Sequence, residues 1–564
     1  MSQYVRFLVF LGGLLLSAQA ARASHAIGGQ LTYEYVGTAS QPNRYRVTAM
    51  MIRECGGTLP TALLVSCRVG TPTTACRSND PRDFGATLVR GQIIGGEPYC
   101  ASLGNTCGAI AGRFNYETAK YEAVVTLPPA PSWTLSVTEN ARPTLANVAP
   151  NTLGDLYLEA TLNNQLTLAG GTTQTITNTS PQYSEQNAPV PFACPQQRSS
   201  LSFSATEPDG DSLVYSLDRA LEGCNQPMRY TPSLGGAVII VSTTPPCVAV
   251  LPTSTSSFFL PTFPLPSFTF TGTCPVRVAI PSFYLNANTG SATFTPYFYD
   301  ANVPANNRYL VIGKVTEYRR LNGRYYLVGS VRRDMMVVVT DCGGNQAPNP
   351  PGTSAGTAGP VTDSLVVESP VLTTTSADFH FTDPNPGDRL TLTATHNIDL
   401  DTYLSLYASG NTTVPLTIVG NGTAAPVLQV RLRPAATLLG RTFRISLRVE
   451  DNGCPVKIVQ HNMLVIRVVP ARTAAAHAEQ LRAGLSVFPN PFNEQVRFSL
   501  PRPQQAGAQV LITDQLGRVV ERLPVPAGPG AEATLTWTPR PGLPAGVYLA
   551  RPASGGPAMR LLRR

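Results

Sequence analysis

The chain is built from short runs in which apolar and polar residues alternate, and these runs are bounded by proline, glycine or asparagine. Clear examples are "NRYRVTAMMIREC" (Asn43–Cys55) and "QVRFSL" (Gln495–Leu500), in which Val496, Phe498 and Leu500 fall on one face. A period of two is typical of half-buried β-strands, and no segment shows the 3.6-residue period of a long amphipathic helix. With 51 prolines and 47 glycines in 564 residues, the sequence predicts an all-β protein with many turns.

The first 23 residues have the pattern of a signal peptide. Arg6 precedes an apolar run from Phe7 to Leu16, and A-x-A patterns end at Ala20 and Ala23, the two candidate cleavage sites. No cysteine follows the apolar run, so a lipoprotein signal is not expected. We therefore expect the mature chain to be exported.

The cysteines agree with an exported protein. No C-x-x-C occurs and the chain has only 5 histidines, so disulfides are expected rather than zinc or redox sites. Because the number of cysteines is odd, at least one thiol must be free or pair between chains. The 11 cysteines are Cys55, Cys67, Cys76, Cys100, Cys107, Cys194, Cys224, Cys247, Cys274, Cys342 and Cys454.

An internal repeat and two proline- or alanine-rich stretches divide the chain. "FSATEPDGDSLVYSL" (Phe203–Leu217) aligns with "FHFTDPNPGDRLTLT" (Phe379–Thr393), which indicates two similar modules. The predicted organisation is a signal peptide (1–23), a cysteine-rich β-domain (24–190), a β-sandwich (191–344), a Pro/Gly linker (345–361), a second β-sandwich (362–470), a linker (471–484) and a C-terminal module (485–564).

The repeated segments carry acidic turns that fit two interpretations. Calcium prefers several oxygen ligands from one loop, whereas Asp, Asn and Gly also occur in turns for their geometry alone. Glu450, Asp451 and Asn452 could complete the second site. The candidate ligands are Glu207, Asp209 and Asp211 around Gly210, and Asp383, Asn385 and Asp388 around Gly387.

Other motifs carry little chemistry. "GTSAG" (Gly352–Gly356) fits the G-x-S-x-G pattern of serine hydrolases, but it lies in the Pro/Gly linker without the strand and helix that this pattern requires. The histidines show no paired metal-binding spacing. We expect no catalytic residue, although a polysaccharide hydrolase with a concealed carboxylate pair remains an alternative. Another is a carbohydrate-binding protein using exposed aromatics, with Tyr297, Phe298 and Tyr299 as candidates.

The basic charge does not indicate nucleic-acid binding. The net charge is +8, and residues 471–564 contribute 11 arginines against 5 acidic residues. These arginines alternate along strands or lie at the terminus, and no aromatic stacking platform accompanies them.

The last eighty residues resemble the type A C-terminal sorting domain of type IX secretion in Bacteroidetes. The pieces that match are "FPNPF" (Phe488–Phe492), "QVRFSL", "VLITDQLGRVV" (Val510–Val520), "LTWTP" (Leu535–Pro539), "LPAGVYLARPASGG" (Leu543–Gly556) and "MRLLRR" (Met559–Arg564). The motif positions correspond here to Pro489, Asn490, Pro491, Gly517, Gly546 and Tyr548, with Arg560, Arg563 and Arg564 as the basic end. The resemblance implies a small β-sandwich that the outer-membrane secretion machinery recognises. In that family the domain is usually removed, and the cargo is released or tethered to surface lipopolysaccharide.

The N-terminal part is similar to Bacteroidetes surface proteins linked to gliding motility and adhesion. The residues that match are "SHAIGGQLTYEYVG" (Ser24–Gly37) and "YRVTAMMIRECGG" (Tyr45–Gly57), and the "EPDGDSL" segment is similar to cadherin-like modules, which often bind calcium. The two resemblances imply tandem Ig/cadherin-like β-sandwiches with a small C-terminal β-sandwich. The expected function is structural or adhesive, without catalysis, for a protein secreted or held at the cell surface. The ligand, protein or glycan, stays open.

Overall fold

The computed structural model describes residues 25–70, 79–107, 113–140, 142–149, 154–183, 190–233, 238–252, 257–353, 364–395, 416–471, 486–501, 508–514, 517–526, 532–553 and 558–563. The predicted signal peptide with Ala20 and Ala23, and nearly all of the predicted linker 471–484, lie outside these residues. The chain forms two compact units, Met1–Val468 and Val469–Arg564. Within the described ranges, no helix is both long and apolar enough to cross a membrane.

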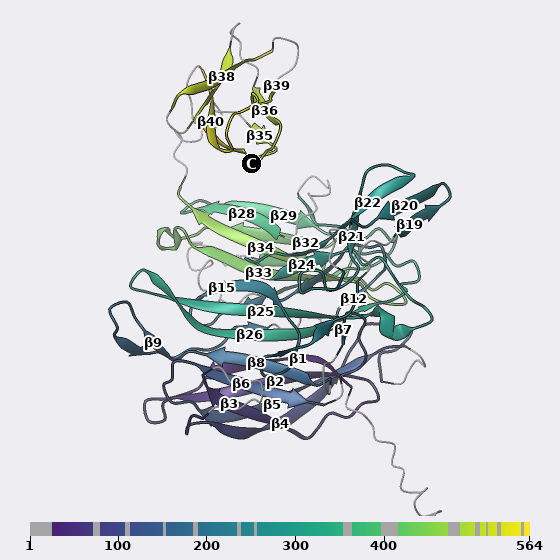
Figure 1. The fold of residues 1–564 in the computed structure, drawn as a ribbon, viewed down its shortest axis with the longest axis vertical. Coiled ribbons are helices and arrows are strands. Elements are labelled where there is room, and N and C mark those ends of the chain that lie inside the picture. The colour runs from purple at the N-terminus through teal and green to yellow at the C-terminus, as the bar shows by residue number, and fades with distance from the viewer. Residues whose placement is uncertain are drawn as a thin grey trace, which may run out of the picture. The chain divides into compact units, whose positions relative to one another are not determined.

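The first unit is organised by one 11-stranded sheet (Figure 1). Along this sheet the order is β1 (Ala26–Tyr35), β2 (Arg44–Glu54), β5 (Tyr116–Thr126), β4 (Phe84–Gly95), β3 (Ala62–Val69), β6 (Trp133–Glu139), β8 (Leu156–Leu162), β26 (Arg324–Val339), β25 (Arg308–Leu321) and β15 (Ser212–Asp218), with β12 (Phe192–Ala193) also on β26. The sheet closes on itself because β26 pairs with both β8 and β1. Alternate residues of its strands, such as Leu31, Val47 and Leu135, are fully buried inside this ring.

Smaller sheets pack around this one. They are β9 (Gln165–Thr167) with β10 (Thr173–Thr175); β11 (Gln182–Tyr183) with β14 (Ala205–Thr206); β13 (Ser199–Ser202), β24 (Ser291–Phe294) and β23 (Phe283–Leu285); β16 (Leu221–Gly223) with β17 (Gln226–Pro227); β7 (Val148–Ala149) with β18 (Arg229–Tyr230); and β19 (Val238–Thr243), β20 (Pro246–Val250), β22 (Val276–Pro281) and β21 (Phe268–Thr271). One short 3₁₀ helix, η1 (Pro304–Asn307), precedes β25.

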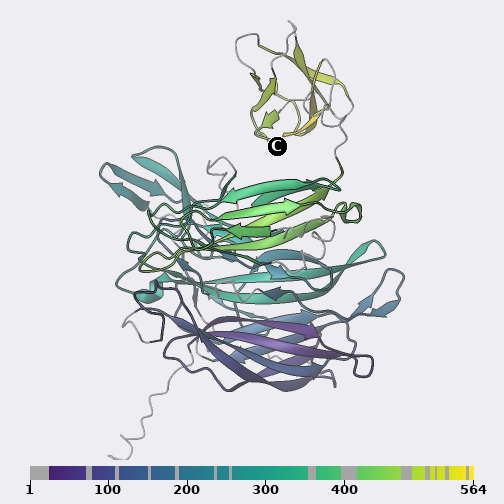
Figure 2. The same cartoon turned by 180° about the vertical axis from the view of Figure 1, so that it is seen from behind.

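The second copy of the repeat forms a sandwich of two four-stranded sheets, seen from behind in Figure 2. One sheet contains β27 (Gly352–Thr353), β29 (Thr375–His380), β32 (Val427–Leu432) and β31 (Leu416–Val419); the other contains β28 (Ser364–Pro370), β34 (Val459–Val469), β33 (Thr442–Glu450) and β30 (Thr391–Thr395). The 3₁₀ helix η3 (Ala436–Leu438) lies between β32 and β33. Phe381, Leu428, Ile445 and Leu464 fill the space between the sheets.

The second unit is a smaller sandwich. One sheet contains β35 (Ser486–Phe488), β36 (Val496–Pro501) and β39 (Glu532–Trp537); the other contains β38 (Val519–Pro524), β37 (Gln509–Thr513), β40 (Gly546–Pro552) and β41 (Met559–Arg563). Val496, Phe498 and Leu500 are buried against Trp537 in its core, as their alternation predicts. The all-β class and the small C-terminal β-sandwich are therefore confirmed.

The strand pairing differs from the expected domain boundary at residue 190. β26, which lies in the predicted second domain, completes the sheet of the first: Gly29 pairs with Asp334, and Val331 pairs with Ala160. One edge of β26 lies along β25, and the other edge pairs with β8, β1 and β12 in turn. Residues 24–190 and 191–344 therefore share one sheet. The physical reason is the length of β26, whose 16 residues provide an edge long enough for several partners.

The first part of the predicted linker 345–361 is packed rather than free. Asn345 is 4% exposed, and its amide donates to Asp451 Oδ2 at 3.1 Å and to the Val456 carbonyl at 2.9 Å. Gly352 and Thr353 pair with β29. The rest of the "GTSAG" motif lies outside the described residues.

The expected disulfides are present. Four bridges join described cysteines: Cys55–Cys107, Cys100–Cys454, Cys194–Cys342 and Cys247–Cys274. Cys67 is the unpaired thiol found in the described part of the chain, and it is fully buried inside the ring sheet. The Cys100–Cys454 bridge links the first domain to the second repeat, so it fixes segments separated by 354 residues.

Candidate functional site

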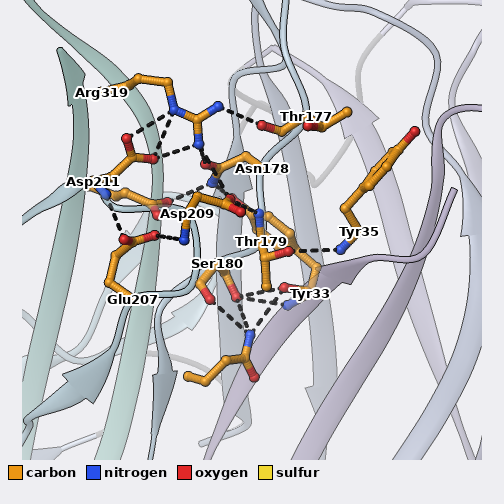
Figure 3. A network of polar contacts seen from close by, with 12 residues as sticks. Tyr33, Tyr35, Thr177, Asn178, Thr179, Ser180, Glu207, Asp209, Asp211 and Arg319 are labelled. Atoms are coloured by element: carbon orange, nitrogen blue, oxygen red, sulfur yellow. Dashed lines mark hydrogen bonds and ion pairs between the residues drawn. The ribbon is translucent and has the colours of Figure 1, made fainter. Parts of the chain in front are cut away.

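The first acidic turn is part of a dense polar network (Figure 3). Glu207, Asp209 and Asp211 lie between β14 and β15, and Arg319 reaches them from β25. The guanidinium donates to Asp211 Oδ1 at 2.9 Å and Oδ2 at 2.7 Å, and to Asp209 Oδ2 at 3.3 Å. It also donates to the Asn178 side chain at 2.8 Å. The arginine therefore supplies the positive charge that these carboxylates need.

Glu207 makes a different set of contacts. Its two carboxylate oxygens accept the backbone N–H groups of Asp209 at 2.9 Å and Asp211 at 2.5 Å, which closes the turn. Its side chain also lies beside the fully buried Glu317 of β25, and carboxylate oxygens of the two residues lie within 4.8 Å of each other. Burial first, and then Glu207, raise the pKa of Glu317 to about 9.

This geometry favours the structural interpretation of the first turn. Glu207, Asp211 and Glu317 have oxygens within 4.8 Å of one another, which is close enough for a shared cation. However, the Arg319 guanidinium already binds Asp211 in a bidentate manner. A calcium ion there would face this fixed positive charge at close range.

The second acidic turn lacks such an arginine. Asp383, Asp388 and Asp451 bring carboxylate oxygens within 4.8 Å of one another, and none of the ion pairs found among the described residues involves them. Asp383 Oδ2 is buried with no hydrogen-bond partner in the part of the chain described. Asp451 is 2% exposed, and burial raises its pKa to about 7. These oxygens are suited to a hard cation.

The other predicted ligands near this turn have different roles. Asn385 Oδ1 accepts the Gln346 N–H at 2.7 Å, and Asn452 Oδ1 accepts the Arg389 N–H at 2.6 Å. Glu450 forms ion pairs with Arg448 and Lys457. Calcium therefore remains a prediction that Asp383, Asp388 and Asp451 support better than the residues of the first turn do.

The C-terminal motif residues shape one edge of the small sandwich. Asn490, between Pro489 and Pro491, donates to the Arg560 carbonyl at 2.6 Å and accepts the Leu562 N–H at 2.8 Å. The motif turn is thereby held against β41, the strand that carries the basic end.

The remaining motif residues are structural, and the basic end is partly engaged. Gly517 has φ +79° in the turn before β38, and Gly546 begins β40. The buried Tyr548 donates its hydroxyl to the Pro544 carbonyl at 2.6 Å. Arg560 is exposed, whereas Arg563 donates to the Leu543 carbonyl. Arg564 lies outside the described residues.

The candidate aromatic strip does not form one surface. Tyr297 packs against Phe268 and Phe270 and donates its hydroxyl to the Ile240 carbonyl at 2.6 Å. Phe298 packs against Tyr297 and the main core, and only Tyr299 is exposed. The first two aromatics therefore belong to the core.

The sequence did not indicate a cavity of about 1050 Å³ in the first unit. Residues of β1, β2, β4 and β5 line one side, residues of β33 and β34 line the other, and Arg333 of β26 lies in the wall. The cavity thus lies among three segments that the sequence assigned to separate domains. Its rim includes the exposed Glu34 and Lys120, and its deepest lining residues include Gln30, Arg333 and His461, which are 9%, 1% and 3% exposed.

His461 lies on β34. Its backbone N–H donates to Ser200 Oγ at 2.6 Å, and its imidazole is buried in the cavity wall. Burial, followed by the charges of Arg448 and Arg333, lowers the pKa of His461 to about 3, so the ring is neutral at physiological pH. No local signal could have identified this site, because its residues meet only after distant strands pair.

Comparisons with known proteins report likenesses of fold. No family model matches the chain, and no curated protein does. Among solved structures, Drosophila N-cadherin EC1-4 is 12% identical over 53% of this chain and 66% of that one, with a TM-score of 0.21. The titin I9-I11 tandem is 8% identical over 68% and 97%, with a TM-score of 0.12. An endo-fucoidan hydrolase from glycoside hydrolase family 107 is 12% identical over 69% of this chain, with a TM-score of 0.15, and the matched region spans 44% of that enzyme.

Proposed function

We propose that this chain is an exported structural or adhesive protein of a bacterial surface, delivered by type IX secretion through its C-terminal module. The observation that carries this proposal is the combination of a disulfide-linked all-β unit with a separate small sandwich whose sequence resembles a sorting domain. Disulfides of this number persist in oxidising compartments, which supports export.

The architecture supports binding rather than catalysis as the role of the first unit. Neither Glu207 nor Glu317 is among the residues that line the cavity, and Glu317 is 0% exposed. A general acid must reach its substrate, and a fully buried carboxyl group cannot. Sandwich surfaces, in contrast, present binding residues without any catalytic group.

Mass spectrometry of washed cells and culture medium tests the delivery. We expect a mature chain that begins near Ala21 or Ser24 and ends before Gly484, on the cell surface or in the medium. A chain that still ends at Arg564 and accumulates in the periplasm would contradict type IX delivery.

A pair of matched variants sharpens the test. Arg560→Ala and Arg563→Ala together alter the basic end and should leave the chain in the periplasm. Arg540→Ala removes an exposed arginine of the same module, outside the motif, and should leave export unchanged. Surface adhesion of cells with and without the exported chain then tests the adhesive role.

A further inference from the structure

The cavity wall concentrates buried polar atoms that have no protein partner. Four of its residues have such an atom among the described residues: Gln30 Oε1, Tyr183 Oη, Arg448 Nε and His461 Nδ1. Buried polar groups are normally hydrogen-bonded, and leaving one unpaired costs about 1–3 kcal/mol. Their presence together in one cavity indicates a polar occupant.

Two cross-strand residue pairs bring polar side chains of the cavity wall together. On the β1–β26 pair, Gln30 lies directly opposite Arg333. On the β33–β34 pair, Arg448 lies directly opposite His461. Side chains directly opposite each other on antiparallel strands share one face, so each pair presents two polar heads together. The sheets therefore hold the site on rigid strands rather than on loops.

More basic than acidic residues line the cavity. Six basic residues line it against four glutamates, and the neutral His461 adds no charge. The Arg333 guanidinium is 1% exposed and lies 5.1 Å from the ring centroid of Tyr183, and its burial lowers its pKa to about 10. A desolvated guanidinium favours an anion nearby.

The size and lining of the cavity indicate more than a single ion. A volume of about 1050 Å³ is at the upper end for pockets that hold a small organic molecule, roughly 300–1000 Å³. Eight Gln, Thr and Ser side chains also line it, and these offer both donors and acceptors. Sugar hydroxyls both donate and accept, so they match such a wall.

We propose that this cavity binds an acidic sugar chain, with a carboxylate or sulfate near Arg333 and Arg448 and the sugar hydroxyls toward Gln30 and His461. The inference rests on the proposed role as a surface binding protein and gives it a ligand class. Its test uses purified protein, so a failure of export and a failure of binding give separate results.

The test is calorimetric titration of the oxidised full-length chain with trigalacturonate and with a sulfated oligosaccharide of similar length. Maltotriose, a neutral sugar, and sodium sulfate, a free anion, are the comparison probes. Tighter binding of an acidic oligosaccharide than of either comparison probe would support the proposal. Equal binding of maltotriose, equal binding of sulfate, or no binding of either acidic oligosaccharide would overturn it.

Variants locate the binding. Gln30→Met and His461→Phe change the deep wall, and each should weaken binding about tenfold, the effect of losing one buried hydrogen bond. Because these two can disturb packing, Lys120→Met at the exposed rim provides a second measurement that does not depend on the core. Lys314→Met on β25 lies outside the cavity and is the matched control. Equal weakening by the rim variant and the control would show general charge attraction and would contradict the site.

Discussion

The Glu207–Glu317 pair makes stability depend on pH in a defined direction. Glu317 has an ordinary pKa of 4.5 when unfolded and about 9 in the folded chain, so the folded state retains a proton that the unfolded state releases. Its contribution is complete below pH 4.5 and is lost as the pH rises through 9. We expect Glu317→Gln, whose amide is permanently uncharged, to unfold at a higher temperature than the wild type at pH 9 and at a similar temperature at pH 5.

Thermal unfolding at the two pH values checks this expectation. The control is Glu122→Gln on an exposed position of β5, which should not change the pH dependence. If Glu317→Gln and the wild type lose stability in parallel between pH 5 and pH 9, Glu317 does not retain a proton in the folded chain.

Arg319 is the residue on which the first acidic turn depends. Its partner Asp211 has a side chain only 3% exposed, so removing the guanidinium leaves a nearly buried carboxylate without its cation. We expect Arg319→Met to lower the free energy of unfolding by about 3–5 kcal/mol. Arg319→Lys should recover only part of this, because a lysine cannot bond both carboxylate oxygens in the same planar manner.

Chemical denaturation measures both variants. Arg46→Met provides a comparison, since its ion pair with Glu34 has side chains 44% and 49% exposed and should contribute no more than about 1 kcal/mol. If Arg319→Met and Arg46→Met lower the free energy of unfolding by similar amounts, the polar network of Figure 3 does not stabilise the fold more than an exposed ion pair does.

At the level of elements, the two repeated turns differ in the groups that surround their carboxylates. Asp451 has a pKa of about 7, raised mainly by burial, and calcium must displace its proton. We therefore expect calcium to raise the unfolding temperature of the first unit at pH 8 and to have less effect at pH 5. Asp383→Asn should abolish the response, whereas Asp209→Asn in the first turn should preserve it.

Calorimetric scans with calcium, with magnesium and with a chelator make this measurement. An unchanged unfolding temperature in the wild type would remove the calcium hypothesis for both turns. Loss of the response in Asp209→Asn would place the ion in the first turn instead, beside Arg319.

Single strands are where the sequence was most informative. In β36 the alternation assigned the buried face correctly, because a period of two depends only on neighbouring residues. The sequence also located the acidic turns, but it did not predict which side chains contact them. Arg319 and Glu317, which meet the first turn, lie more than a hundred residues from Glu207 in the chain. Which carboxylate meets an arginine depends on strand register, and register between distant strands has no local signature.

At the scale of the molecule, the absence of a local signature for pairing between distant strands explains why the sequence predicted a domain boundary at residue 190 and did not indicate the cavity. Sequence spacing separated residues 24–190 from 191–344, yet Gln30 pairs with Arg333 and both line one cavity. The C-terminal module could be delimited as a unit because the strand pairings described for it are made within its own segment. Local modules can therefore be predicted as units, whereas a sheet assembled from both ends of a long segment cannot.

The two units should also unfold independently. Residues up to Val468 share sheets, clusters and the Cys100–Cys454 bridge, while the small sandwich has its own core. We expect calorimetry of the full chain to show two transitions, and a chain ending at Ala471 to lose only the smaller one. Substituting both Cys100 and Cys454 by serine should lower the larger transition, since a bridge closing a long loop contributes about 2–5 kcal/mol.

The variant with serine at Cys100 and Cys454 also tests whether packing or the disulfide joins the second repeat to the ring sheet. Without the bridge, the second repeat is still attached by the buried contacts of Asn345 and by the cluster around Tyr99, Val456 and Ile458. We therefore expect the larger transition to stay single at its lower temperature. If it splits into two, the disulfide rather than packing joins the repeat to the ring sheet. A cavity built between them would then form only in the oxidised protein, because one of its walls would no longer be fixed.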